Sequence, residues 1–252
     1  MRFKLLFIKG IQSIAVEELN ISVPDAKIDE IQKDAIILRS FMPFDFLRAS
    51  LHSFTRIENL ETGYTAVMAS ENWRRAFVPA GIHPSLAYAM CRLARIDAES
   101  ILLDPMCGGG TIPIIAHKYF NPKMVIASDK SGSAVDKTLI NSKNAQINKQ
   151  FMCFRSDIRH LKLGENSISR IITNMPFGIR VDSHKQNIQT YVDFYQKCVK
   201  IIQLNGLIVV LTQEKKLFSD LFDSQPSPFQ KVAALQIESG GLKPFIYIYK
   251  KH

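Results

Sequence analysis

Short β-rich runs alternate with longer helix-like runs from residue 101 onward, the pattern of a parallel sheet covered by helices on both faces. The predicted strands cover residues 100–104, 124–129, 151–156, 168–174 and 206–212. The predicted helices cover residues 85–95, 133–147, 187–203 and 214–222. Most of the chain is therefore expected to be a doubly wound, Rossmann-like α/β domain.

The end of the chain follows a different pattern. Residues 231–250 read as two strands that join at Gly240-Gly241 with no helix between them, which predicts an antiparallel hairpin. A parallel sheet that ends in such a hairpin resembles the methyltransferase form of the doubly wound fold more than the dinucleotide-binding form.

The first part of the chain predicts a separate small module. Its order is a strand at 3–8, a helix at 11–20, strands at 26–31 and 34–39, a helix at 44–53 and a strand at 56–60. This order is typical of an α+β ferredoxin-like module. We expect two domains, residues 1–65 and 66–252, joined by a connection over residues 62–82.

Charge separates the two parts further. Residues 1–67 hold 8 Lys and Arg against 9 Asp and Glu, which leaves 24 against 14 for the rest of the chain. The positive charge behind the chain's net charge of +9 therefore belongs to the larger part. With 46% hydrophobic residues over 252 positions, the chain can bury a sizeable core, which excludes a disordered or fibrous protein. A basic surface favours a nucleic-acid partner.

The cysteines and the apolar runs bear on location. The four cysteines form no CxxC pair and no zinc-ligand spacing, so we expect a reduced, cytoplasmic protein without a metal. The apolar run at the start of the chain breaks after four residues, and no run approaches the roughly 18 residues of a membrane helix, so we expect no membrane insertion.

A glycine-rich turn follows the first strand of the larger domain, over residues Asp104–Thr111. Such a turn brings the backbone close to a ligand and opens a helix whose first amides are free to bind. Pro113 occupies the third glycine position of the dinucleotide pattern, and the phosphate-loop ending is absent, which leaves S-adenosylmethionine as the predicted ligand. The predicted contacts from the turn are Asp104, Pro105, Cys107, Gly108, Gly110 and Thr111. Within this group Cys107 suits a small packing residue better than a nucleophile.

Three carboxylates follow three successive strands. Asp104 is predicted to accept hydrogen bonds from the cationic amino-acid end of the cofactor. Asp129, at the end of the next strand, can take both ribose hydroxyls. Asp157, after the third strand, can reach the adenine amino group. His83 and Ser85 precede the helix that leads into the first strand, and we predict that they touch the amino-acid end.

The fourth strand ends in Asn174-Met175-Pro176-Phe177-Gly178. An exocyclic amine is a poor nucleophile because its lone pair is delocalised into the ring. The Asn174 side-chain oxygen and the Met175 carbonyl can accept both amine hydrogens and so aim the lone pair. Asn174 is also a predicted cofactor contact. Pro176 fixes the turn and Phe177 offers a face on which an extruded base can stack. Arg180 is a candidate for a phosphate or base contact.

These residues resemble a known family, the tRNA guanine-N2 methyltransferases that act in the acceptor stem and their THUMP-containing relatives. The resemblance covers residues 80–252 and rests on residues 83–90, 104–111 and 174–180. A single proline after Asn174 is closer to the guanine-N2 branch than to the Asn/Asp-Pro-Pro-Tyr/Phe pattern of adenine-N6 enzymes. Residues 10–19 resemble the start of the family's ferredoxin-like module, and the short connection at 62–82 leaves no room for its RNA-binding THUMP domain.

The resemblance implies an enzyme that uses S-adenosylmethionine to methylate the N2 amine of a guanine in RNA, with tRNA as the expected partner. A protein partner or a second copy would compensate for the missing THUMP domain. Two alternatives stay open: an adenine-N6 methyltransferase acting on DNA or RNA, and a non-catalytic RNA-binding subunit of a methyltransferase complex.

Overall fold

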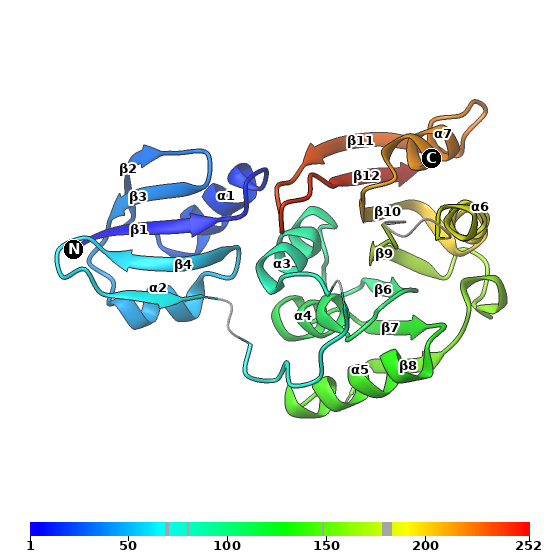
Figure 1. Ribbon diagram of the computed structural model, residues 1–252, viewed down its shortest axis with the longest axis horizontal. Helices are drawn as coiled ribbons and strands as arrows, with labels where there is room; N and C mark the ends of the chain where they lie inside the picture. Colours follow the sequence, from blue (N-terminus) through cyan, green and yellow to red (C-terminus); the bar gives the residue numbers. More distant parts are fainter. Residues whose placement is uncertain (69–70, 80, 148, 178–182) are drawn as a thin grey trace.

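The computed structural model describes the chain apart from residues 69–70, 80, 148 and 178–182, and apart from the side chains of residues 183–186. The chain forms two sheets, one of five strands and one of seven (Figure 1). No helix in these described segments is long and apolar enough to cross a membrane.

The five-stranded sheet belongs to the N-terminal module. Its elements are β1 (Arg2–Phe7), α1 (Gln12–Ser22), β2 (Lys27–Ile31), β3 (Ala35–Arg39), α2 (Phe44–Ser50), β4 (Phe54–Asn59) and β5 (Thr65–Val67). The strand order is β2-β3-β1-β4-β5, and every neighbouring pair is antiparallel. The first four strands with α1 and α2 make the predicted ferredoxin-like arrangement.

The larger sheet and its helices follow. The strands are β6 (Ile101–Asp104), β7 (Met124–Asp129), β8 (Phe151–Arg155), β9 (Ile168–Asn174), β10 (Ile202–Thr212), β11 (Phe229–Gln236) and β12 (Phe245–Lys251). The helices are α3 (Pro84–Leu93), α4 (Thr111–Phe120), α5 (Gly132–Asn144), the 3-10 turn η1 (Ile158–His160), α6 (Ser183–Ile201) and α7 (Lys215–Phe222).

The seven strands have the order β11-β12-β10-β9-β6-β7-β8. Strands β6 to β10 pair in parallel, and β12 is antiparallel to both β10 and β11. The hairpin between β11 and β12 turns at Gly240 and Gly241, which both have positive φ, at 58° and 77°. The predicted doubly wound sheet with a final antiparallel hairpin is therefore confirmed.

Helices cover both faces of this sheet (Figure 1). Successive strand residues point to opposite faces, so Leu102 packs in the core beneath α3 and α4, whereas Leu103 packs in the core beneath α6 and α7. The order β6, β9 and β10 at the centre brings the ends of β6 and β9 next to each other. This adjacency positions the two sequence motifs side by side.

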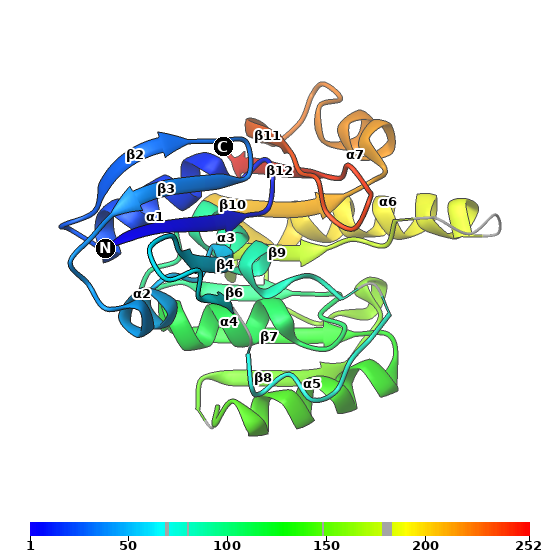
Figure 2. The same ribbon diagram turned by 60° about the vertical axis from the view of Figure 1, so that its left-hand side comes forward.

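The module docks onto the larger domain through a shared core. Buried side chains of β1, α1 and β4 join those of α3, α4 and β12 in one continuous cluster. The Glu238 amide donates to the Lys9 carbonyl at 3.0 Å, where the turn after β1 meets the C-terminal hairpin (Figure 2). At the neighbouring Gly10, a Cβ would lie 2.0 Å from the Gln236 carbonyl oxygen, so only glycine permits this approach.

The domain boundary predicted at residue 65 stays a prediction. Strand β5 of the small sheet spans Thr65–Val67 and so continues two residues beyond that boundary.

Some boundaries differ from expectation. The helix predicted to reach residue 53 ends at Ser50, because the buried Glu18 carboxylate accepts the next free amides, those of His52 and Ser53. The helix predicted at 187–203 spans 183–201, and β10 begins at Ile202, which pairs with Ile168. Strand β5 and the turn η1 were not predicted, since three-residue elements carry too little pattern to be recognised.

Candidate active site

A cavity of about 700 Å³ opens at the carboxyl ends of the parallel strands. Ligands of open α/β sheets bind at this edge. The lining includes Asp104, Asp129, Asp157, Asn174, Met175, Pro176 and Phe177 from the strand ends, Pro105, Cys107, Gly108 and Thr111 from the glycine-rich turn, and Val78, Gly81 and Ile82 from the connection. The fold thus gathers both sequence motifs around one space.

The glycine-rich turn is shaped by two residues with left-handed backbone. Gly108 has φ of 55° and Gly110 has φ of 80°. A Cβ on Gly110 would lie 2.7 Å from the Thr138 Cγ2, so glycine is required there for packing against α5, and Gly110 does not line the cavity. The Thr138 hydroxyl donates to the Gly108 carbonyl at 2.9 Å and holds the turn.

Asp104 is almost completely buried at the end of β6. Its Oδ1 accepts hydrogen bonds from the Thr173 hydroxyl at 2.8 Å and the Met106 amide at 3.1 Å. Burial raises the pKa of Asp104 to about 7, against the two hydrogen bonds, which favour the carboxylate; nearby Asp129 adds to the rise. A cationic ligand group beside Asp104 would restore the charged form.

Asp129 ends β7 and faces the same cavity. Its Oδ2 accepts the Gly108 amide at 3.0 Å and its Oδ1 accepts the Ser131 amide at 2.9 Å. One carboxylate therefore holds the glycine-rich turn and the start of α5 together. Its predicted role toward a ribose is compatible with this position and stays a prediction.

Asp157 begins η1 after β8. It accepts the Arg159 amide at 3.0 Å and forms an ion pair with the Arg159 side chain. This hydrogen-bonded pairing lowers the pKa of Asp157 to about 2. Asp157 is thus ionised at neutral pH, and its oxygens can act as hydrogen-bond acceptors for an amino group.

The segment after β9 is fixed by hydrogen bonds to β10 and to two side chains of α6. The Met175 amide donates to the Leu211 carbonyl, which continues the pairing with β10. The Pro176 carbonyl accepts the Tyr191 hydroxyl at 2.9 Å and the Asn187 amide side chain at 3.2 Å, both from α6. Phe177 lies half-buried at the cavity wall. The sequence motif alone gave no sign of this support from α6.

Besides Gly110, two further predicted contacts do not line the cavity. Ser85 is buried, and its hydroxyl donates to the Phe54 carbonyl at 2.8 Å, so it ties α3 to the module instead of facing the cavity. His83 caps α3 by accepting the Ser85 amide, and it does not line the cavity either.

Cys107 is buried against the Thr138 hydroxyl, as a packing residue would be. Arg180 lies outside the described residues.

Nothing in the sequence indicated the role of Asn141 on α5, whose side chain bonds to two backbone segments beside the cavity. Its side-chain oxygen accepts the amides of Arg75 and Ala76 at 3.0 Å each, and its side-chain nitrogen donates to the carbonyls of Ala76 and Gly109 at 2.8 Å. Asn141 therefore binds the connection to the glycine-rich turn. A single polar residue in a helix offers no sequence signal for this long-range role.

These side chains suit S-adenosylmethionine better than a dinucleotide. The glycine-rich turn carries a buried carboxylate and no cationic side chain, an environment that repels a pyrophosphate and attracts a cation. Among the residues that the structure describes, no group of three or more His, Cys, Asp or Glu side chains is placed to hold a metal ion.

Comparisons with known proteins add independent findings. Residues 71–244 match the family UPF0020, described as "RMKL-like, methyltransferase domain". The chain is 29% identical over 187 residues to the tRNA (guanine(6)-N(2))-methyltransferase THUMP3 of Mus musculus, covering 69% of this chain and 37% of that protein. It is 26% identical to the tRNA (guanine(6)-N2)-methyltransferase of Methanocaldococcus jannaschii, covering 67% and 54%. The chain thus spans little more than a third of the mouse protein's length.

A solved structure shares the entire fold. TrmN from Thermus thermophilus superposes with a TM-score of 0.84 at 16% identity, covering 100% of this chain and 99% of that one. Similarity at this level of identity establishes the architecture, including the small N-terminal module.

Proposed function

Because the chain belongs to the RMKL-like methyltransferase domain family, we propose that it transfers the methyl group of S-adenosylmethionine to the exocyclic N2 amine of a guanine in RNA, with tRNA as the substrate class. The observation that carries this proposal is the shared cavity, which places Asp104 and Asn174 at the ends of adjacent strands. One carboxylate for the cofactor and one amide for the acceptor amine thus meet in a single space.

The cofactor side of the site is formed by the three carboxylates. Asp104 binds the ammonium of the amino-acid end, and the positive charge of this group favours the ionised form of the buried carboxyl. Asp129 binds the ribose hydroxyls while it holds the Gly108 amide. Asp157 accepts the adenine amino group. Each of these roles is supported by the position of the carboxylate on the cavity wall. Each carboxylate also suits its group, either by opposite charge or as a hydrogen-bond acceptor.

The acceptor side is formed by the segment after β9. The Asn174 side-chain oxygen and the Met175 carbonyl accept the two hydrogens of the guanine amine, which localises the nitrogen lone pair. The hydrogen bonds from Tyr191 and Asn187 to the Pro176 carbonyl keep this segment rigid. Phe177 stacks on the extruded base. The residues contribute chiefly by orienting the amine.

S-adenosylmethionine supplies an electrophilic methyl group and keeps the electron pair of the broken carbon–sulfur bond. The amine nitrogen provides the electron pair of the new bond and becomes acidic once methylated. The methylated amine can then release this proton to water, so no strong general base is required.

Support for guanine and for tRNA comes from the relatives, whose names give guanine N2 in tRNA as their target. The excess of Lys and Arg beyond residue 67 suits a polyanionic substrate. We place the activity in the cytoplasm, and we infer that a protein partner or a second copy adds to the RNA-binding surface.

The decisive test is nucleoside mass spectrometry on unmodified tRNA incubated with the protein and isotopically labelled S-adenosylmethionine. We expect labelled N2-methylguanosine from the wild type and a loss of at least about a hundredfold in Asn174→Ala. Binding of S-adenosylhomocysteine, measured by calorimetry, should survive that substitution within a few fold.

Other outcomes would point to other functions. Labelled N6-methyladenosine would show that the acceptor base is adenine and not guanine. Cofactor binding without any labelled nucleoside, in an RNA complex that Asn174→Ala leaves intact, would favour a non-catalytic subunit.

A further inference from the structure

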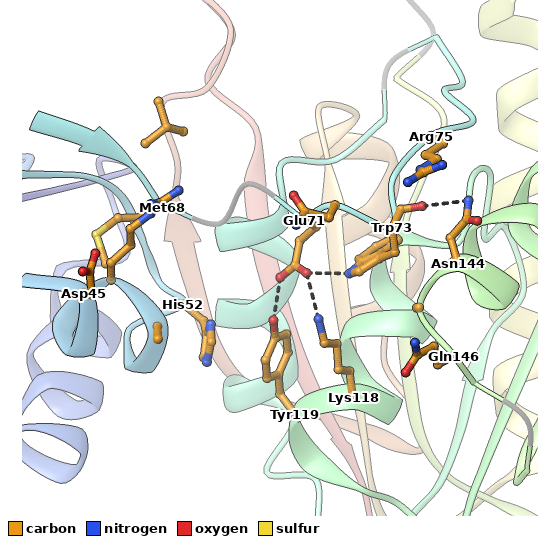
Figure 3. A pocket seen from close by; sticks show the side chains of 15 residues that line it. Asp45, His52, Met68, Glu71, Trp73, Arg75, Lys118, Tyr119, Asn144 and Gln146 are labelled. Atoms are coloured by element: carbon orange, nitrogen blue, oxygen red, sulfur yellow. Dashed lines mark hydrogen bonds and ion pairs between the residues drawn. The ribbon is translucent and has the colours of Figure 1, made fainter.

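A second cavity, of about 600 Å³, lies between the module and the larger domain. We call it the inter-domain cleft. Helix α2 contributes Asp45 to it, the connection contributes Trp73 and Arg75, and the ends of α4 and α5 contribute further polar side chains (Figure 3). Arg48 of α2 also lines the cleft. None of these groups has a role in the methyl-transfer site.

Glu71 occupies the centre of the cleft wall. It accepts hydrogen bonds from the Tyr119 hydroxyl at 2.7 Å and the Trp73 indole, and it forms an ion pair with Lys118 at 3.2 Å (Figure 3). Its side chain is only 8% exposed. The negative charge of Glu71 is thus compensated within the protein, and these bonds fix the connection against α4.

Two arginines of the cleft are not compensated in this way. Arg48, from α2, and Arg75, from the connection, both have exposed side chains. Within the described part of the chain, no carboxylate lies within ion-pair distance of either guanidinium. Burial lowers the pKa of nearby His52 to about 4, so this ring adds no charge at neutral pH. Two exposed cations therefore face the cleft from both of its sides.

The connection leads directly from this cleft to the methyl-transfer cavity. Residues 71–73 and Arg75 line the cleft, whereas Val78 and Ile82 line the cavity. Between them Phe77 is 64% exposed, and the Arg74 guanidinium lies 5.5 Å from its ring centroid. An exposed aromatic ring beside a cation is a suitable surface for stacking a nucleic-acid base.

The character of the cleft favours a polymer over a small molecule. Sites for small ligands bury most of the ligand surface, but most side chains of this cleft, including Arg48, Arg75, Asn144 and Gln146, are themselves exposed. Besides the carboxylates of Asp45 and Glu71, the lining carries arginines and amide side chains. These groups suit phosphate and sugar groups, which form most contacts in protein–nucleic acid complexes.

We propose that the inter-domain cleft binds the backbone of the RNA substrate. Arg48 and Arg75 contact phosphates on opposite sides of the cleft. Arg74 and Phe77 contact the RNA strand between the cleft and the methyl-transfer cavity. The inference rests on the proposed function, because it assigns the path by which an RNA substrate reaches Asn174. It also gives the N-terminal module a share in substrate binding.

The test compares binding of unmodified tRNA to full-length variants by filter binding over a salt titration. Arg48→Gln combined with Arg75→Gln should weaken binding about tenfold and reduce the salt slope by about 1.5. Arg48→Lys combined with Arg75→Lys keeps both charges and should retain most of the affinity. Phe77→Ala should weaken binding several-fold without a change in salt slope. All of these side chains are exposed, so the fold is not at risk.

The matched control is Lys27→Gln combined with Lys33→Gln. These exposed lysines lie on and after β2, at the edge of the small sheet opposite β5, and their removal should leave tRNA affinity unchanged. S-adenosylhomocysteine binding should equal the wild type in every variant.

The outcomes separate the two proposals. If the arginine-to-glutamine variant binds tRNA with wild-type affinity and slope while the wild type methylates tRNA, the RNA path is overturned and the proposed function stands. If the wild type binds S-adenosylhomocysteine but neither binds nor methylates tRNA, the tRNA substrate and the RNA path both fall.

Discussion

The Thr173 hydroxyl donates a 2.8 Å hydrogen bond to the buried carboxylate of Asp104. These residues belong to the two motifs of the site, since Thr173 directly precedes Asn174 and Asp104 opens the glycine-rich turn. The bond favours the charged form of a group whose burial favours the neutral form. The Thr173 hydroxyl on β9 thus lowers the pKa of Asp104 on β6.

Binding of S-adenosylhomocysteine should therefore depend on pH. The pKa of Asp104, raised to about 7, leaves this side chain mainly neutral at pH 6 and mainly ionised at pH 8. We expect the affinity to rise about tenfold between these pH values. Calorimetric titrations across this range would measure the change, and an equally steep change in Asp104→Asn would contradict the assignment.

The stability of the ligand-free protein should change in the opposite sense. Between pH 4 and pH 7 the folded chain holds a proton on Asp104 that the unfolded chain releases, so this group lowers the free energy of unfolding as pH rises. Asp104→Asn should accordingly raise the Tm at pH 8 relative to the wild type. A lower Tm at pH 8 would show that the carboxylate stabilises the empty site.

Thr173→Val removes the hydrogen-bond donor and preserves the shape of the side chain. The pKa of Asp104 should then rise further, which moves the pH midpoint of S-adenosylhomocysteine binding upward by about one unit. Affinity should be restored at alkaline pH. Thr65→Val, an exposed threonine of β5, is the control that should leave the midpoint in place.

Gly110→Ala should destabilise the protein by about 2–3 kcal/mol, from its left-handed backbone and from the clash with Thr138. Thr138→Ala in the same chain should recover the clash component, which a double-mutant cycle measured by urea unfolding would reveal. Gly240→Ala has positive φ but no neighbour within 4 Å, so it should cost only about 1 kcal/mol. Equal costs for the two glycines would contradict the packing role.

Asn141→Ala should lower the free energy of unfolding by about 2–4 kcal/mol, because backbone groups of the connection and the glycine-rich turn lose their partner. S-adenosylhomocysteine affinity should fall with it, since both segments line the cavity. The control is Asn144→Ala on the same helix, whose side chain is exposed and makes one long hydrogen bond of 3.5 Å. Similar losses for the two asparagines would refute this role.

Tyr191→Phe tests the support beneath Pro176. The substitution removes the hydrogen bonds of this hydroxyl to the Pro176 carbonyl and to the Thr212 hydroxyl. It should loosen the segment after β9 and lower kcat about tenfold, with little change in S-adenosylhomocysteine affinity. Tyr195→Phe, on the same helix and half-buried, is the matched control and should keep wild-type kcat. A change confined to cofactor affinity would assign Tyr191 to the other half of the site.

The sequence predicted the elements of the site that sit at strand ends. Asp104, Asp129 and Asn174 are each the last residue of a strand, and parallel strands bring such positions to one edge of the sheet. Helix and strand order, the final hairpin and the ferredoxin-like module followed from the same alternation of apolar and polar runs.

Contacts between distant segments were beyond prediction. Asn141 on α5 bonds to the Gly109 carbonyl, and Tyr191 on α6 bonds to the Pro176 carbonyl. Neither pair produces a periodic pattern in the sequence. Ser85 was expected near the cofactor because it precedes the first strand, yet position along the chain does not tell which side of α3 it faces. The same limit hid the contribution of Val78 and Ile82 to the cavity.

The cluster of buried side chains that runs from β1 through α3 to β12 makes the two modules a single cooperative unit. A chain cut at residue 66 would present to water the apolar faces of α3 and of the hairpin that β1, α1 and β4 normally cover. The small module therefore covers an apolar surface of the larger domain, and it could not be exchanged for another module without redesigning the surface beneath it.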